Sequence, residues 1–310
     1  MRPLKFHPIL KQTLWGGERI IPYKELASGL SRVGESWELS GMPGSESVVA
    51  EGPWAGSTLS ELIGRFGAEL LGKANYARFG QEFPLLVKFI DAREDLSIQV
   101  HPDDELARKR HGKSGKCEMW YVLEAEPGAS LLTGFSRPIA PAEYERRVAD
   151  NTLTDVLNRQ AIASGDVFYL PAGRVHSIGK GSFIVEIQQS SDITYRIYDF
   201  DRRDAAGNSR ELHTELAREA IDFESSENSR ITYAPENNQE VRLVTTPYFT
   251  TSLYTLTART RCDWSATDSF VAIVLLQGSG SLTDNEGNRI DVRQGETWFC
   301  LLYTSPSPRD

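Results

Sequence analysis

The chain has 310 residues, of which 25% are charged and 40% hydrophobic, and it carries a net charge of −9. This length allows one large domain or two ordinary ones, each with its own core. The acidic balance argues against a nucleic-acid or anionic-membrane partner, because both require a basic face. Basic groups gathered in one pocket would therefore indicate a small anionic ligand.

The first residues lack the uninterrupted apolar core of a signal peptide, and no run of about 18 apolar residues is present. We therefore expect a cytoplasmic, soluble protein. The three cysteines, Cys117, Cys262 and Cys300, are odd in number and widely spaced, so no disulfide framework is predicted.

Residues 1–56 are rich in Gly, Pro and Trp, which predicts short strands and turns. Residues 57–80 are expected to be helical, because apolar side chains recur there at helical spacing. The strongly apolar strand expected over Phe83–Asp91 contains Lys88. A buried ammonium there would need an anionic partner or a ligand, whereas a lysine snorkelling from a strand end is the reading that the strand alone favours.

Two further strands carry side chains that can bind a metal. Gln99 and His101 are two residues apart before Pro102, so a strand projects both to the same side. After a stretch interpreted as a charged loop, Glu118 begins the next strand. Cys117 points to the opposite side of that strand and is expected to be a small buried residue.

A third strand, followed by a turn, ends close to His176. Neighbouring antiparallel strands would then deliver two imidazoles, one carboxylate and one amide oxygen. An isolated histidine is more often a polar barrel residue, but four suitable groups at strand-compatible spacing favour a divalent metal. The predicted ligands are Gln99, His101, Glu118 and His176.

Two short helices are expected within 140–160, and strands are expected at 167–170, 183–188 and 194–198. Residues 201–240 are polar, with a capped helix predicted over 216–221. Peripheral positions are expected for His7 and His111, and a solvated one for His213.

The last third of the chain alternates strands and turns in the manner of a small jelly roll. Gly295–Phe299 repeats the form of Gly165–Tyr169, which predicts a second barrel related to the first. No histidine follows His213, so the second barrel cannot rebuild the metal cage. Prolines after about residue 299 are incompatible with a paired strand, and we hypothesise that this barrel is truncated or altered there.

Four segments occur in the order Ile98–Asp104, Lys116–Met119, Leu170–Ile178 and Ser190–Asp199. Together they resemble type I phosphomannose isomerase (mannose-6-phosphate isomerase) in its short bacterial form, a member of the cupin superfamily. The resemblance covers nearly the whole chain, from Trp15 to about Phe299. The presence of all four segments makes the match specific.

This resemblance implies a mainly β fold with two cupin-type jelly-roll β-barrels and a small helical insertion. The catalytic barrel would span 1–235, with helical segments at about 57–80 and 140–160, and the second barrel 236–310. The resemblance also implies one Zn²⁺ per chain, held by Gln99, His101, Glu118 and His176. Further positions that match the family are the catalytic Arg196, the acid Asp192, and the pocket residues Lys88, Ser97 and Lys116.

The implied activity is the interconversion of mannose 6-phosphate and fructose 6-phosphate through a cis-enediolate. Arg196 offers a fixed positive charge for an oxyanion or a phosphate, the alternative being an ion pair with Asp199 or Asp192. The base is Lys116 or Glu186, although Glu186 reads equally well as a solvated carboxylate.

Lys116 can instead bind the phosphate, together with Lys88 and Ser97. Asp192 can orient Arg196 or Lys116, or cap a turn.

Two other classes of protein would have the same metal ligands: a cupin that senses a sugar phosphate without turnover, and an iron-dependent oxygenase. In each phosphate-binding reading the partner is a small-molecule sugar phosphate, with neither nucleic acid nor membrane involved, and the chain is a monomer or a weak homo-oligomer.

Overall fold

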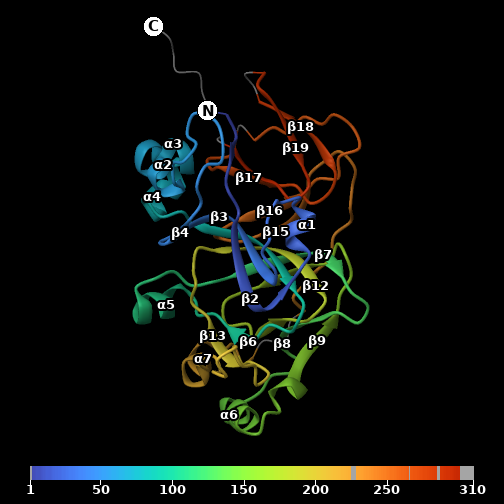
Figure 1. Ribbon diagram of the computed structural model, residues 1–310. Coiled ribbons are helices and arrows are strands. Elements are labelled where there is room, and N and C mark those ends of the chain that lie inside the picture. Colours follow the sequence, from blue (N-terminus) through green and yellow to red (C-terminus); the bar gives the residue numbers. More distant parts are fainter. Residues whose placement is uncertain (1, 225–227, 265, 285–286, 301–310) are drawn as a thin grey trace.

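The computed structural model describes residues 2–224, 228–264, 266–284 and 287–300. Its largest element is an antiparallel sheet of eight strands, which runs across the middle of the molecule (Figure 1). In spatial order the strands are β14 (Arg230–Ile231), β10 (Val167–Leu170), β7 (Glu118–Ala125), β12 (Ser182–Gln189), β5 (Leu85–Ala92), β2 (Ile9–Gly17), β3 (Val33–Met42) and β4 (Ser45–Glu46).

A second antiparallel sheet packs against one face of the first. Its strands are, in order, β13 (Tyr195–Tyr198), β6 (Ile98–Val100), β11 (His176–Ile178), β8 (Ser130–Phe135) and β9 (Leu157–Ala161). Apolar side chains from both sheets fill the space between them, among them Ile90 and Trp120 from the large sheet and Leu131 and Ile178 from the small one. The metal-binding candidates lie at one end of this layered core.

Strand register explains why several polar side chains lie on the inner face of the large sheet, the face that packs against the small sheet. Glu186 of β12 stands opposite Lys88 of β5 and Trp120 of β7, and Gln188 stands opposite Glu118. Residues directly opposite each other in antiparallel strands project to the same face of the sheet. All five side chains therefore point toward the small sheet.

The remaining described strands belong to three smaller sheets. β1 (Leu4–Lys5) and β17 (Val271–Val274) both pair with β20 (Thr297–Cys300), so the first residues of the chain lie beside the last described strand (Figure 1). Two hairpins complete the set, β15 (Val241–Thr245) with β16 (Thr250–Leu253), and β18 (Ser279–Thr283) with β19 (Arg289–Arg293).

The helices lie at the edges and ends of the sheets. They are α1 (Ile20–Tyr23), α2 (Leu59–Phe66), α3 (Ala68–Leu71), α4 (Lys73–Phe79), α5 (Asp104–His111), α6 (Pro141–Ala149), the 3₁₀ turn η1 (Leu153–Val156) and α7 (Thr214–Ala220). The helical segments predicted over 57–80 and 140–160 are thus confirmed. Thr58 and Glu61 form a reciprocal capping box at the start of α2, which satisfies two backbone N–H groups.

The interpretation of residues 102–116 as a charged loop is wrong, because α5 occupies half of that segment. Asp103 caps α5 by accepting a hydrogen bond from Leu106 N at 2.8 Å, and Gly112 ends the helix in the left-handed conformation. Acidic residues in the first turn and basic ones in the last complement the helix dipole. Ala107 is the single buried residue of α5, so apolar periodicity gave no signal.

The predicted echo between the two halves of the chain is found at two turns. Asp166 accepts a hydrogen bond from Ala163 N at 2.8 Å before β10, and Glu296 accepts one from Arg293 N at 3.2 Å before β20. Gly165 and Gly295, each preceding the acid, both have positive φ, 90° and 80°. The same turn therefore leads into both strands.

These elements confirm a mainly β fold with a small helical portion. The division of the chain into two barrels near residue 235 stays a prediction. The hypothesis that the second barrel is truncated or altered after about residue 299 concerns residues 301–310, which lie outside the described residues. Among the described helices, none is both long and apolar enough to cross a membrane.

Candidate metal centre

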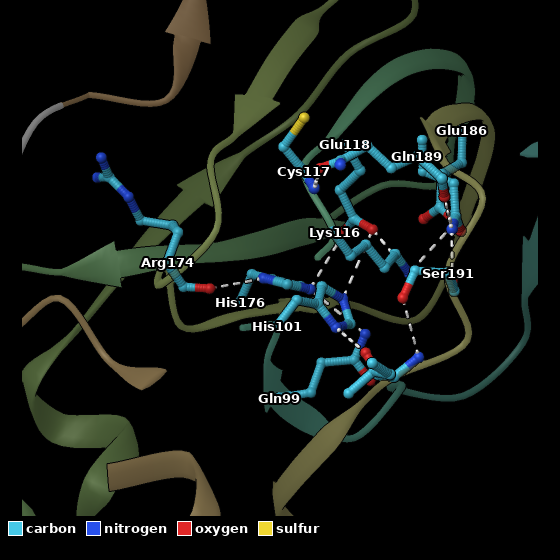
Figure 2. Close-up of polar contacts among 12 residues, drawn as sticks. Gln99, His101, Lys116, Cys117, Glu118, Arg174, His176, Glu186, Gln189 and Ser191 are labelled. Carbon is cyan, nitrogen blue, oxygen red and sulfur yellow. Dashed lines mark hydrogen bonds and ion pairs between the residues drawn. The ribbon is translucent and has the colours of Figure 1, made fainter. Parts of the chain in front are cut away.

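Three buried side chains converge where the two sheets meet. His101 follows β6, Glu118 begins β7 and His176 begins β11. Their ligand atoms lie within 4.8 Å of one another, and the Glu118 carboxylate reaches both imidazoles from one side (Figure 2). The distance from Glu118 Oε1 to His176 Nε2 is 3.2 Å, and that from Glu118 Oε2 to His101 Nε2 is 3.6 Å.

Backbone carbonyls fix the orientation of both imidazoles. His101 Nδ1 lies 2.8 Å from the carbonyl oxygen of Ile193, and His176 Nδ1 lies 2.8 Å from that of Arg174. A carbonyl oxygen only accepts, so each Nδ1 carries the hydrogen and each Nε2 presents a lone pair to the cluster. This is the arrangement of a metal-ligating histidine.

The charges at this point also suit a cation. Burial, reinforced by the Lys116 ammonium, holds the pKa of His101 well below its usual range. Burial likewise lowers the pKa of His176, outweighing the opposite effect of Glu118. Both imidazoles are therefore neutral near pH 7, which is the form that binds metals.

Unsatisfied polar atoms test the fit to a metal. Among the described residues, His101 Nε2 and both carboxylate oxygens of Glu118 are buried without a hydrogen-bond partner. The Lys116 ammonium lies 2.9 Å from Glu118 Oε2 as an ion pair, although its geometry is not that of a hydrogen bond. Leaving such groups unpaired costs about 1–3 kcal/mol each, so their arrangement fits a site that would hold a cation.

The fourth predicted ligand lies beside the three. Gln99 pairs with His176 across β6 and β11, and its Nε2 lies 3.3 Å from His176 Nε2. Ser97 Oγ donates to Gln99 Oε1 at 3.3 Å. A half-turn of the amide exchanges its oxygen and nitrogen and would direct the oxygen to the cluster.

A row of alternating charges leads away from the cluster along the inner face of the large sheet. Lys116 Nζ lies 3.9 Å from Glu186 Oε1, and Lys88 Nζ lies 3.1 Å from the same oxygen and 3.7 Å from Glu35 Oε2. The indole of Trp120 donates to Glu186 Oε2 at 2.9 Å. Lys116 thus connects the metal cluster to a buried carboxylate that has three donors or cations around it.

Two interpretations based on single strands, a snorkelling Lys88 and a solvated Glu186, are wrong. Lys88 lies in the middle of β5 and is 8% exposed, so it does not snorkel from a strand end, and Glu186 is buried rather than solvated. Burial favours the neutral form of Glu186, but the ammonium groups of Lys88 and Lys116 outweigh it and lower its pKa. Burial of Lys88 is likewise outweighed by Glu186 and Glu35, which raise its pKa. Both groups are charged.

Arg196 of β13 stands opposite Gln99 of β6, which places both on the same face of the small sheet. Its Nη1 donates to the carbonyl of Glu211 at 2.9 Å, while its Nε is buried without a hydrogen-bond partner among the described residues. The backbone N–H of Arg196 donates to His213 Nδ1 at 3.2 Å, so the expectation of a merely solvated His213 is wrong.

Asp192 lies in the turn after β12, and its described ion pair runs to Lys113 at 2.9 Å, with both side chains about half exposed. Neither contact that sequence reasoning expected, with Arg196 or with Lys116, occurs among the described hydrogen bonds and ion pairs. Cys117 is buried in the core on the outer face, as predicted.

Sequence reasoning missed three residues at the site: Glu35, Trp120 as a hydrogen-bond donor, and Gln188. Gln188 Nε2 donates to the carbonyls of Gln189 and Ser191 at 2.8 and 2.9 Å, and its Oε1 is buried without a partner among the described residues. Its spacing of two from Glu186 on one strand was the available signal.

A buried site of two histidines and one carboxylate between antiparallel sheets defines a candidate metal-dependent protein of the mainly β class. Comparison with known proteins narrows this class. Residues 4–132 match the family described as phosphomannose isomerase type I, catalytic domain.

Two curated relatives come from Bacillus subtilis. The probable mannose-6-phosphate isomerase GmuF is 35% identical, covering 91% of this chain and 88% of its own, and the mannose-6-phosphate isomerase ManA is 34% identical, covering 92% and 88%. The crystal structure of the mannose 6-phosphate isomerase from the same species superposes with a TM-score of 0.87 at 29% identity, covering 96% of this chain and 93% of that one. The chain belongs to the mannose-6-phosphate isomerase family of type I.

Proposed function

We propose that this chain is a zinc-dependent aldose–ketose isomerase that interconverts mannose 6-phosphate and fructose 6-phosphate through a cis-enediolate. The observation that carries the proposal is the buried cluster of His101, Glu118 and His176 beside the charged row that begins at Lys116. Relatives that share about a third of their residues with nearly the whole chain are named mannose-6-phosphate isomerases.

The ligand set suits zinc. Nε2 of His101, Nε2 of His176 and one oxygen of Glu118 would hold the ion, with the amide oxygen of Gln99 as a fourth ligand. Zinc, when bound, supplies positive charge that polarises a carbonyl and stabilises an enediolate oxygen. Neutral imidazoles and an orphaned carboxylate support this assignment.

Isomerisation requires a proton to move between C1 and C2 of the sugar, and two groups of the row can carry it. The Glu186 carboxylate is charged and can accept the proton from one carbon, and the Lys116 ammonium can donate a proton to the other. Return of the proton from Glu186 to Lys116, whose Nζ lies 3.9 Å from Glu186 Oε1, would restore both groups. Lys88 and Trp120 hold Glu186 in its ionised form and in one orientation. We assign Lys116 and Glu186 as the acid–base pair.

Arg196 provides the charge for the anionic part of the substrate. Its guanidinium stays protonated, although burial and then Arg210 lower its pKa, and its Nε has a free donor. We assign it to the substrate phosphate or the developing oxyanion. We assign Ser97 and Lys88 to substrate binding. Asp192, which is half exposed and paired with Lys113, would take part from the surface next to the site.

A sugar-phosphate sensor would keep the metal ligands but would not need a buried acid–base pair. An iron oxygenase would tolerate the loss of Lys88 and Lys116. The ion pairs that place Lys116 and Glu186 next to the cluster therefore favour the isomerase. A cytoplasmic location and a monomeric or weakly associated state remain predictions.

The test is fructose 6-phosphate formation from mannose 6-phosphate by the purified chain, before chelation, after it, and after adding back Zn²⁺ or Fe²⁺ separately. We expect chelation to abolish activity and Zn²⁺ to restore it. Binding of mannose 6-phosphate by a folded, zinc-loaded chain without any turnover would replace the isomerase with the sensor. Oxygen consumption with Fe²⁺ would replace it with the oxygenase.

A further inference from the structure

The segment that carries Lys116 and Glu118 is held by a carboxylate that lies outside the cluster of His101, Glu118 and His176. Asp104, the first residue of α5, accepts hydrogen bonds at Oδ1 from Gly115 N at 2.9 Å and from Gln189 Nε2 at 3.0 Å. Its Oδ2 accepts a hydrogen bond from the Tyr248 hydroxyl at 2.7 Å. One side chain thus ties together three distant parts of the chain.

Three successive amides of this segment have fixed partners. Gly115 N donates to Asp104, Lys116 N donates to the carbonyl of Pro102 at 3.0 Å, and Cys117 N donates to Gln189 Oε1 at 2.8 Å. Figure 2 shows Gln189 alongside Cys117, Glu118 and Lys116. Because the backbone on both sides of Lys116 is fixed, so is the direction in which its side chain leaves toward Glu118.

The packing at Gly115 is as tight as the hydrogen bonding. A Cβ added there would lie 2.4 Å from the carbonyl carbon of Asp103 and 2.5 Å from Asp104 N. The start of α5 therefore lies directly against residues 115–117.

Tyr248 joins the start of α5 to the C-terminal part of the chain. It lies between β15 and β16, its ring packs against the core shared with the outer face of the large sheet, and the Arg78 guanidinium lies 5.0 Å from the ring centroid. Arg78 also donates to the carbonyl of Pro247 at 2.7 Å. The hydroxyl of Tyr248 is thus presented to Asp104 by a ring that packs partly buried against the core.

We propose that Asp104, Gln189 and Tyr248 form a clamp that positions Lys116 and Glu118 for the metal site, so that the C-terminal hairpin β15–β16 contributes to catalysis without touching the substrate. These three are positioning residues. The kinetic consequence rests on the proposed function, whereas the clamp itself is measurable without it.

The decisive variants differ in what they keep. Asp104→Asn retains an oxygen for Gly115 and Gln189 and offers an N–H to the Tyr248 oxygen, whereas Asp104→Ala removes every contact. Tyr248→Phe removes one hydroxyl and keeps the ring. Tyr233→Phe is the matched control, because the Tyr233 hydroxyl donates to the carbonyl of Gly165 at 2.6 Å, outside the clamp.

Amide hydrogen exchange with zinc bound measures the clamp directly. We expect Asp104→Ala to speed exchange across 112–118 by at least about 10-fold, Tyr248→Phe to speed it less, and Asp104→Asn and Tyr233→Phe to leave it unchanged. Unchanged exchange in Asp104→Ala and in Tyr248→Phe would overturn the proposal, whether or not the wild-type chain is an isomerase. Should Asp104→Ala fail to fold, Tyr248→Phe decides in its place.

Steady-state kinetics on mannose 6-phosphate measures the consequence. Loss of a supporting contact around a metal site costs about 10- to 100-fold, so we expect that fall in kcat for Asp104→Ala, with KM within about 3-fold and zinc content unchanged. Asp104→Asn should recover most of kcat. An Asp104→Ala chain with accelerated exchange but wild-type kcat would overturn the positioning role, and an inactive wild type with intact exchange protection would refute the isomerase but not the clamp.

Discussion

The turn and strand that lead to the candidate metal site have a second copy near the end of the described chain, and the two copies differ in their partner strands. At Gly165–Leu170 the strand β10 pairs with β7, and its Leu170 stands opposite Glu118. At Gly295–Cys300 the strand β20 pairs with β17, and Cys300 stands opposite Val271. The turns match in φ and in hydrogen bonding, but only the first copy faces a carboxylate.

The comparison shows that the backbone plan and the chemistry are separable. A glycine followed by an acid builds the turn in both places, because positive φ and an accepted N–H are local requirements. The metal cluster instead depends on residues of neighbouring strands, namely His101, Glu118 and His176. Substitutions in the cluster should therefore change metal content or turnover, whereas substitutions in the turn should change stability.

The largest effect is expected from Glu118→Gln. The substitution removes the negative charge beside the two imidazoles and leaves the Lys116 ammonium buried without its nearest partner. We expect loss of stoichiometric zinc, measured by elemental analysis, and a fall in kcat/KM of at least about 100-fold. Glu124→Gln on the exposed end of the same strand is the control, and zinc retained by Glu118→Gln would contradict the ligand assignment.

Glu186→Gln should come next, because it removes the proposed proton acceptor and keeps the ligands. Zinc content should stay at the wild-type level while kcat falls by about 10²–10⁴-fold, the usual contribution of a general acid or base. Activity within a few-fold of wild type would assign the carboxylate to structure alone.

Arg196→Ala tests the charge assigned to the substrate anion. We expect turnover to fall by about 10²–10³-fold with zinc content unchanged. Arg196→Lys restores the charge without the planar fork and should recover only part of the loss. Unchanged turnover in the alanine variant would remove Arg196 from the catalytic set.

The smallest effects belong to the shared turn. Gly165→Ala and Gly295→Ala should each lower the free energy of unfolding in urea by about 1 kcal/mol, since positive φ strains any residue with a Cβ. The loss should be larger at 295, where a Cβ would lie 2.9 Å from Lys24 Cγ, than at 165, where the nearest atom is 3.5 Å away. Gly29→Ala, with open space and no positive φ, is the control; an equal loss there would refute the common turn.

Strand alternation predicted that Gln99 and His101 project to one side of their strand. Bringing Glu118 and His176 to them depended on the further expectation that the three strands are antiparallel neighbours, and the structure does bring His101, Glu118 and His176 together. The strand-and-turn pattern together with the family resemblance predicted the mainly β fold, and the repeated glycine–acid pair predicted the echo of Gly165 in Gly295. Alternation fails where partners come from other strands, and for this reason the burial of Lys88 and Glu186 was misjudged.

The contacts of Asp192 and the helix α5 show two other limits. From the sequence, Asp192 could pair with Arg196 or Lys116. The ion pair that it forms, with Lys113, depends on the folded arrangement of the two loops. Helix α5 is built by its cap and its charges rather than by apolar periodicity, so a search for a buried face does not find it.

The most direct test of the account is the position of the metal. Anomalous scattering at the zinc edge from crystals grown with Zn²⁺ should place one ion about 2.0–2.2 Å from Nε2 of His101, Nε2 of His176 and a carboxylate oxygen of Glu118. A zinc peak elsewhere, or no peak with those three side chains placed as they are here, would contradict the account.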